Sequence, residues 1–212
     1  MGTRNLTMVQ LNNEIKIAQY GQWDGYLEGA GATIFDFLKN LIRNKNIEKF
    51  KENVRNCIII DRSKIRDYYL ELGVDIDKTD WIEYSISQEY AKRHPQLNRD
   101  LGADILRYIM NNGPQELKNE IDFAKQSLFC EWGYLVNLDK ETLEIYKGFQ
   151  EEPLDESERF FYLQDEKCNK YYPIKKVFEL PFNIIVGIDK KSFLNVCNYN
   201  IYGNIEDEEN EE

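Results

Sequence analysis

The chain has few of the residues that build metal sites and covalent cross-links. It has one histidine, His94, and four widely spaced cysteines without a C-x-x-C pair: Cys57, Cys130, Cys168 and Cys197. A zinc site would need ligands from scattered positions, and no P-loop or dinucleotide-binding fingerprint is present. We therefore expect no metal site, no cofactor and no disulfide framework, with the thiols kept free in a reducing compartment.

Long apolar runs and clusters of basic residues are also missing. No apolar run approaches the roughly 18 residues of a membrane span, and the start of the chain carries neither a signal peptide nor the serine or threonine of a myristoylation motif. These absences predict a cytoplasmic protein with no membrane partner. Lysine and arginine are not gathered into a basic patch, which argues against direct binding to a nucleic-acid backbone.

Charge is concentrated at the C-terminus. The net charge is −11, and residues 206–212 supply six carboxylates and no base. We expect a single domain over residues 1–203 followed by an acidic, disordered tail over 204–212. An alternative is that the acidic chain is an inhibitor that mimics nucleic acid.

The pattern of apolar residues predicts an α+β fold. Hydrophobic residues make up 42% of the chain, which is long enough to bury a core. Two apolar runs flank Asn12-Asn13, which indicates a β-hairpin, and a second hairpin is predicted from Leu128 to Phe149 around a turn at 139–141. A third pair of strands is predicted at 160–163 and 171–180, followed by a helix over 189–197. Because strands are grouped, we expect a mainly antiparallel sheet of β-hairpins, with a large helical section between the first and second hairpins.

The helical section has visible starts and stops. Asp61 is a typical N-cap for a helix that Gly73 ends, and Cys57–Ile60 is either a short strand or the start of that helix. Further helices are predicted over 82–93 and 99–110. Asp100 and Asp104 fit the favourable end of the latter helix dipole. After Asn112-Gly113-Pro114 the periodicity predicts one more helix, through Leu117, Ile121 and Ala124.

A glycine-rich loop over residues 19–31 is the best candidate for a site. It joins the first hairpin to a helix and combines amides, an indole, a carboxylate and phenols with glycines that let the backbone approach a partner. Its candidate ligand-binding residues are Gln19, Gln22, Trp23, Asp24 and Tyr26. The alternative is a tight structural connection in which Trp23 fills the core and Asp24 caps a turn.

Two residues outside the loop complete the candidate site. Arg4 precedes the first strand, and Glu131 lies in the cluster Phe129-Cys130-Glu131-Trp132-Gly133 at the start of the second hairpin. Cys130 would act as a nucleophile only if it met His94 in space, and a buried strand cysteine is the simpler interpretation.

The motifs at the N-terminal end carry a family resemblance. The chain opens with Gly2-Thr3-Arg4-Asn5-Leu6 and continues to Ala18-Gln19-Tyr20-Gly21-Gln22-Trp23-Asp24-Gly25-Tyr26. Through these motifs it resembles a family of uncharacterised proteins encoded in bacteria, phages and some eukaryotes, and the likeness extends through 100–103 and 127–132 to 146–149. Members usually have proline at the position of Leu27 and a bulkier residue at that of Ala30. The resemblance implies an accessory or mobile-element product and brings no established activity.

The order of elements is also similar to that of the N-terminal-nucleophile hydrolases. In those enzymes the first residue after processing supplies both the attacking side chain and the base. Thr3 is the only candidate here, with Arg4 and Asp24 in support, and a cleavage beyond the loss of Met1 would be required. The sequence thus supports three hypotheses: a protein that binds a small polar ligand or a host protein through the loop, an amide-bond hydrolase, and an acidic inhibitor.

Overall fold

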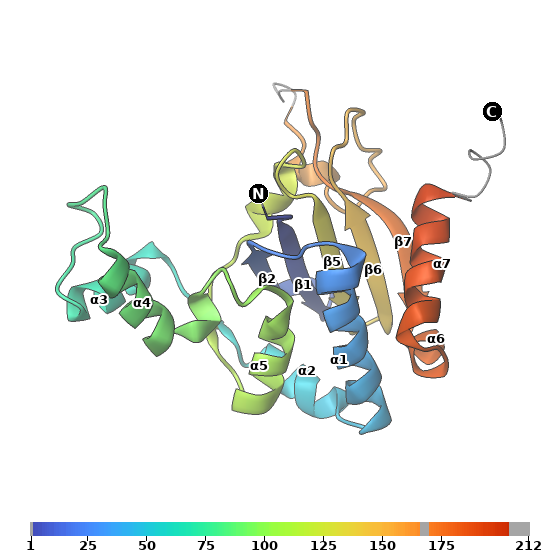
Figure 1. Cartoon of the computed structure of the whole chain (residues 1–212), viewed down its shortest axis with the longest axis horizontal. Coiled ribbons are helices and arrows are strands. Elements are labelled where there is room, and N and C mark those ends of the chain that lie inside the picture. Colours follow the sequence, from blue (N-terminus) through green and yellow to red (C-terminus); the bar gives the residue numbers. More distant parts are fainter. Residues whose placement is uncertain (1, 166–169, 204–212) are drawn as a thin grey trace.

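A computed structural model describes residues 2–165 and 170–203 and shows an α+β fold (Figure 1). Five strands form the main sheet, in the spatial order β2-β1-β5-β6-β7. All neighbours are antiparallel except β1 and β5, which are parallel, so the predicted mainly antiparallel sheet is confirmed. The strands are β1 (Asn5–Leu11), β2 (Glu14–Gly21), β5 (Trp132–Asn137), β6 (Thr142–Lys147) and β7 (Lys175–Pro181).

The first hairpin forms as the sequence predicts. Asn12 and Asn13 have φ of 57° and 60°, a left-handed conformation that asparagine tolerates better than most residues. The backbone N–H groups of both residues donate to the Asp139 carboxylate, each at 2.8 Å. Since Asp139 lies in the turn between β5 and β6, these bonds hold the two hairpin turns together at one end of the sheet.

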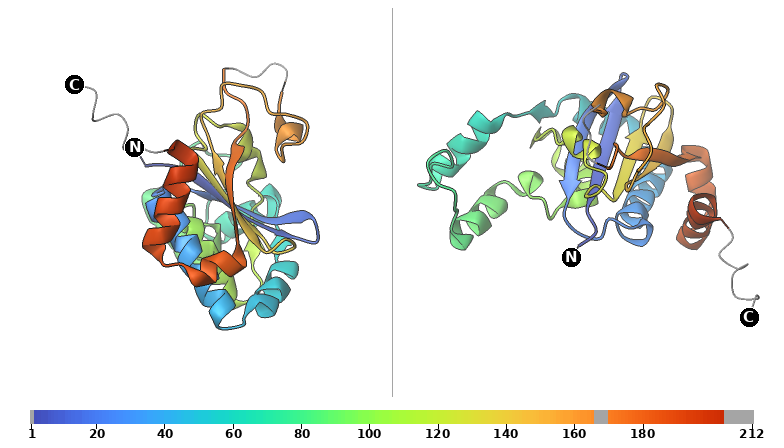
Figure 2. Two further views of the ribbon diagram at one scale, coloured as in Figure 1. Left: turned by 90° about the vertical axis from the view of Figure 1, so that its right-hand side faces the viewer. Right: turned by 90° about the horizontal axis from the view of Figure 1, so that it is seen from above.

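Helices cover one face of the sheet (Figure 2). Phe35 stacks on Phe193 with ring centroids 4.6 Å apart, which joins the first of these helices to the last. None of the helices in 2–165 and 170–203 is long and apolar enough to cross a membrane. The covering helices are α1 (Ala32–Arg43), α2 (Ile47–Arg55), α5 (Ile105–Asn112), α6 (Phe182–Gly187) and α7 (Lys190–Tyr202).

The other face carries a second apolar cluster, covered by loops and short 3-10 turns, and a buried polar network. Glu144 is 1% exposed and accepts hydrogen bonds from Arg159 Nη2 at 2.8 Å, Asn137 Nδ2 at 2.9 Å and Tyr146 Oη at 2.5 Å. Burial and the adjacent Glu144 raise the pKa of Tyr146, so its hydroxyl keeps its proton and donates. Arg159 also reaches Gln10 on β1, so the network ties the 150–165 segment to three strands.

Residues 61–94 form an arm that extends away from the sheet (Figure 1). It contains α3 (Arg62–Glu71) and α4 (Tyr84–Arg93) and follows β3 (Ile58–Ile59), which pairs in parallel with β4 (Glu116–Leu117). A small cluster of Tyr68, Tyr90 and Leu97 packs where the arm meets the rest of the chain. Asp61 caps α3 by accepting from Lys64 N, and Gly73 follows the helix with φ of 83°, both as predicted.

Several predicted elements are wrong in kind or in position. Leu117 lies in β4 and not in a helix: its backbone pairs with Ile59 and its side chain is buried in the main hydrophobic core. Residues 121–125 form only a 3-10 turn. No strand forms over 160–163: Phe160 packs on Tyr146, and 161–163 is a 3-10 turn. The last strand starts at Lys175 and not at 171, and the predicted helix over 99–110 begins as a 3-10 turn at Gly102–Asp104. The predicted tail over 204–212 lies outside the described residues.

We expect the variant Arg159→Met to lower the free energy of unfolding by about 3 kcal/mol, because it leaves the Glu144 carboxylate buried without its charged partner. Chemical denaturation measures this loss. Arg62→Met is the control: Arg62 is exposed and pairs with Asp77 at the surface, so its removal should change stability by less than about 1 kcal/mol. Equal effects of the two variants would show that the buried network does not stabilise the fold.

Candidate functional site

Strand register brings the predicted site residues to one end of the sheet. Asn5, the first residue of β1, pairs with Gly21 at the end of β2 and with Trp132 at the start of β5. Arg4, the loop after Gly21, and Glu131 therefore lie at the same sheet end. Arg4 N donates to Glu131 Oε1 at 3.3 Å, so these two residues are in direct contact.

Backbone hydrogen bonds fix the glycine-rich loop to the sheet. Gly25 N donates to Thr3 O at 2.9 Å, and the buried Tyr134 hydroxyl donates to Gly25 O at 2.8 Å. Ala30 N donates to Asp24 O at 2.7 Å and closes the loop on the short π-helical turn Leu27–Gly31, which leads into α1. These bonds anchor the loop to the end of the sheet, and Asp24 has a left-handed backbone with φ of 51°.

Trp23 and Asp24 line a surface hollow of about 190 Å³. Trp23 Nε1 donates to Asp100 Oδ1 at 2.9 Å, and the Trp23 side chain stays 53% exposed rather than filling the core. Asp24, Asp100 and Asp104 all line the hollow, and one arginine, Arg107, pairs with Asp104 at 3.2 Å. We call this the Trp23 hollow; carboxylates and an indole are its main functional groups.

The other predicted residues support the loop or lie beside it. Gln19 is buried, and its Nε2 donates to Asn98 O at 3.4 Å; Gln22 accepts from Tyr20 Oη at 2.6 Å. Tyr26 is half exposed. The Arg4 guanidinium lies over the Phe129 ring, 4.6 Å from its centroid. Among the described residues, only Trp23 and Asp24 of the seven candidates line the Trp23 hollow.

The candidate nucleophiles are buried. Thr3 is 4% exposed beneath the loop. Cys130 is fully buried, and burial raises the pKa of its thiol, which disfavours the reactive thiolate. His94 lies at the arm, stacked on Tyr68 at 3.9 Å. Cys57, Cys130 and Cys197 are free thiols, and Cys168 lies outside the described residues.

Sequence reasoning missed Asp100 and Asp104 as site residues. Both carboxylates lie near the start of a predicted helix, where they favour the helix dipole. Nothing in the linear sequence shows that the glycine-rich loop packs against them. The only signal was the position of Asp100 in a family-like motif. In the structure, Gln22 N donates to Arg99 O at 3.2 Å, and this bond sets the loop against residues 99–104.

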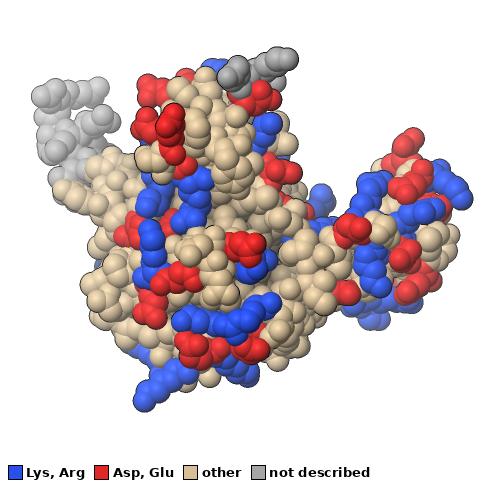
Figure 3. All heavy atoms as spheres, turned by 180° about the vertical axis from the view of Figure 1, so that it is seen from behind, with Lys and Arg blue, Asp and Glu red and all other residues tan. Residues whose placement is uncertain are grey.

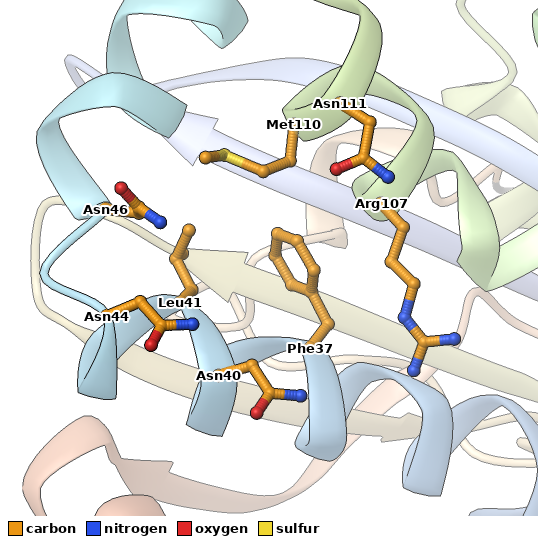
Figure 4. A pocket seen from close by; sticks show the side chains of 8 residues that line it. All are labelled: Phe37, Asn40, Leu41, Asn44, Asn46, Arg107, Met110 and Asn111. Atoms are coloured by element: carbon orange, nitrogen blue, oxygen red, sulfur yellow. The ribbon is translucent and has the colours of Figure 1, made fainter.

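Two further hollows were not predicted. One, of about 250 Å³, lies between α1 and α5 (Figure 4): Phe37, Leu41 and Met110 form an apolar floor, and Arg107 and four asparagines surround it. The other, of about 470 Å³, lies between α4 of the arm and residues 97–100, and we call it the arm cavity. Charges on the surface shown in Figure 3 are mixed in sign, both on the arm and around the sheet.

We expect Gly29→Ala to displace the loop and lower stability by about 1–3 kcal/mol. The new Cβ would lie 2.2 Å from Asp24 O, a backbone atom that already accepts from Ala30 N. Denaturation would be measured beside Gly187→Ala, whose Cβ would meet nothing within 4 Å. If Gly29→Ala is no more destabilising than the control, the loop is not held as tightly as its contacts indicate.

Comparison of the chain with family models, with curated proteins and with solved structures found no match, so the family resemblance of the N-terminal motifs stays an expectation.

Proposed function

We propose that the protein binds a partner protein by accepting one positively charged side chain, a lysine or an arginine, in the Trp23 hollow. The observation that carries this proposal is the Trp23–Asp100 hydrogen bond, which holds an exposed indole beside a group of carboxylates. Trp and Tyr are the residues most often found as anchors of protein interfaces, and Trp23 and Tyr26 are both about half exposed on this loop.

The size of the hollow supports a single side chain rather than a complete small molecule. Sites for drug-sized ligands have volumes of roughly 300–1,000 Å³. The Trp23 hollow, at about 190 Å³, is smaller than this range. A guanidinium or ammonium group at the end of a partner's side chain needs less space, and the rest of the partner would lie over the surrounding surface.

The chemistry of the hollow supports a cation. Three carboxylates line it, and Arg107 offsets only one of them. A tryptophan face attracts cations, with about 0.5–1 kcal/mol at exposed sites. Arginine fits carboxylates in a planar, two-pronged geometry, so we expect it to bind better than lysine.

Binding is supported over catalysis by the composition of the lining. Of the described residues that line the hollow, none is a histidine, a cysteine or a lysine, and Thr33 is its only hydroxyl side chain. A nucleophile with an adjacent base, the usual arrangement for covalent catalysis, is not assembled there.

The test uses N-acetyl-arginine amide as the probe and N-acetyl-citrulline amide as its neutral match, followed by NMR at the Trp23 indole N–H. We expect the arginine probe to shift this signal saturably, with an affinity that falls as salt is raised, and the citrulline probe to have little effect. Equal binding of both probes would contradict the proposal.

Charge variants should change this binding in opposite directions. Asp24→Asn is expected to weaken it about threefold and Arg107→Gln to strengthen it by a similar factor, because exposed charge pairs contribute about 0.2–1 kcal/mol. Asp122→Asn, an exposed carboxylate on the 3-10 turn Ile121–Lys125, is the matched control. A shift in the same direction for Asp24→Asn and Arg107→Gln would exclude an electrostatic role for the hollow.

A further inference from the structure

The arm cavity is the one hollow described above that has the size of a small-molecule site. Its volume of about 470 Å³ lies within the range of roughly 300–1,000 Å³ that such sites occupy, and the other two hollows are smaller than this range. It lies where the arm meets the body of the chain, and its walls come from the arm helices, from residues 97–100 that follow the arm directly, and from Lys118.

The arm supplies an aromatic wall. Tyr69, Tyr84 and Tyr90 line the cavity. Tyr69 and Tyr90 stack on one another with centroids 4.2 Å apart and planes 6° from parallel, while Tyr84 is 77% exposed. Tyrosine offers flat apolar area with a hydroxyl at its end and loses little side-chain entropy on binding.

The body supplies a basic wall. Arg99 and Lys118 line the cavity, and neither has an ion pair within the described residues. Lys118 Nζ has one long hydrogen bond, at 3.5 Å to Leu97 O. The single carboxylate in the lining, Asp100, already accepts from the Trp23 indole. The lining therefore has an excess of positive charge.

One buried polar atom at the cavity lacks a partner. Tyr90 is 5% exposed, and its hydroxyl has no hydrogen bond to any described residue. Leaving a buried hydroxyl unpaired is unfavourable, and such groups are rare in folded proteins unless they have a role. The hydroxyl itself has almost no accessible surface, so a ligand reaches it when neighbouring side chains shift, and a hydrogen bond accepted from Tyr90 then removes this cost.

We infer that the arm cavity binds a small anion carried on a planar ring, a carboxylate or a phosphate. Arg99 and Lys118 contact the anionic group, the tyrosine rings contact the ring, and the Tyr90 hydroxyl donates to the ligand. This site adjoins the cation-accepting Trp23 hollow, with which it shares Asp100, and it has the opposite charge preference.

The test is an NMR titration of the full chain with phenyl phosphate and with benzoate, beside benzylammonium and benzyl alcohol as cationic and neutral matches. We expect saturable shifts for residues of α4 and for 97–100 with one or both anions, and the difference between the two anions identifies the preferred group. Absence of saturable shifts with both anions, or equally tight binding of benzylammonium, would overturn the inference.

Variants separate a binding role from a structural one. Arg99→Gln and Lys118→Gln should each weaken binding of the preferred anion about tenfold, and Tyr90→Phe about fivefold. Arg62→Gln, an exposed arginine of the same arm that is outside the cavity, should leave binding unchanged.

Tyr90→Phe carries a second readout. Because it removes an unpaired buried hydroxyl, we expect its denaturation midpoint to equal or exceed that of the parent, while its binding falls. If this variant binds the anion as tightly as the parent does, the hydroxyl does not contact the ligand and the inferred geometry is wrong.

Discussion

The parallel pairing of β1 with β5 is the constraint on which the rest of the structure depends. It joins two hairpins that are separated by more than 100 residues and makes β1 an interior strand, with all seven of its residues buried. Both faces of β1 are buried, because helices cover one face of the sheet and loop segments fixed by the Glu144–Arg159 network cover the other. The same pairing brings Arg4, the glycine-rich loop and Glu131 to one end of the sheet.

Local chemistry explains which elements the sequence predicts well. The Asn12-Asn13 turn, the Asp61 cap and the stops at Gly73 and Gly113 are set by backbone preferences of single residues, and each forms as expected. The errors come from short apolar stretches. Phe160 and Leu117 are buried by contacts with distant segments, and periodicity over a few residues cannot show whether such a residue belongs to a strand, a helix or a turn.

The candidate sites follow the same division. Trp23 and Asp24 stand out as candidates in the sequence because a dense run of functional groups and glycines lies in one loop, and both line a hollow in the structure. The sequence could not show that Asp100 lies beside Trp23, because the two residues are 77 positions apart in the chain. The arm cavity could not be predicted from the sequence at all. The tyrosines on α3 and α4 have the spacing of ordinary helix packing, and they form one wall of a cavity only because the arm lies against Arg99 and Lys118.

Asp100 lines both the Trp23 hollow and the arm cavity. It is held from one side by the Trp23 indole and from its own segment by Asn98, whose Oδ1 accepts from Asp100 N at 3.0 Å. A molecule that moves Asp100 in the Trp23 hollow also changes the lining of the arm cavity, and the reverse holds as well. Thermodynamic linkage requires this effect to be mutual. If an occupant of the first hollow changes the binding free energy at the second, an occupant of the second changes the binding free energy at the first by the same amount. Asp100 is therefore the residue through which the two proposed sites, with their opposite charge preferences, would be coupled.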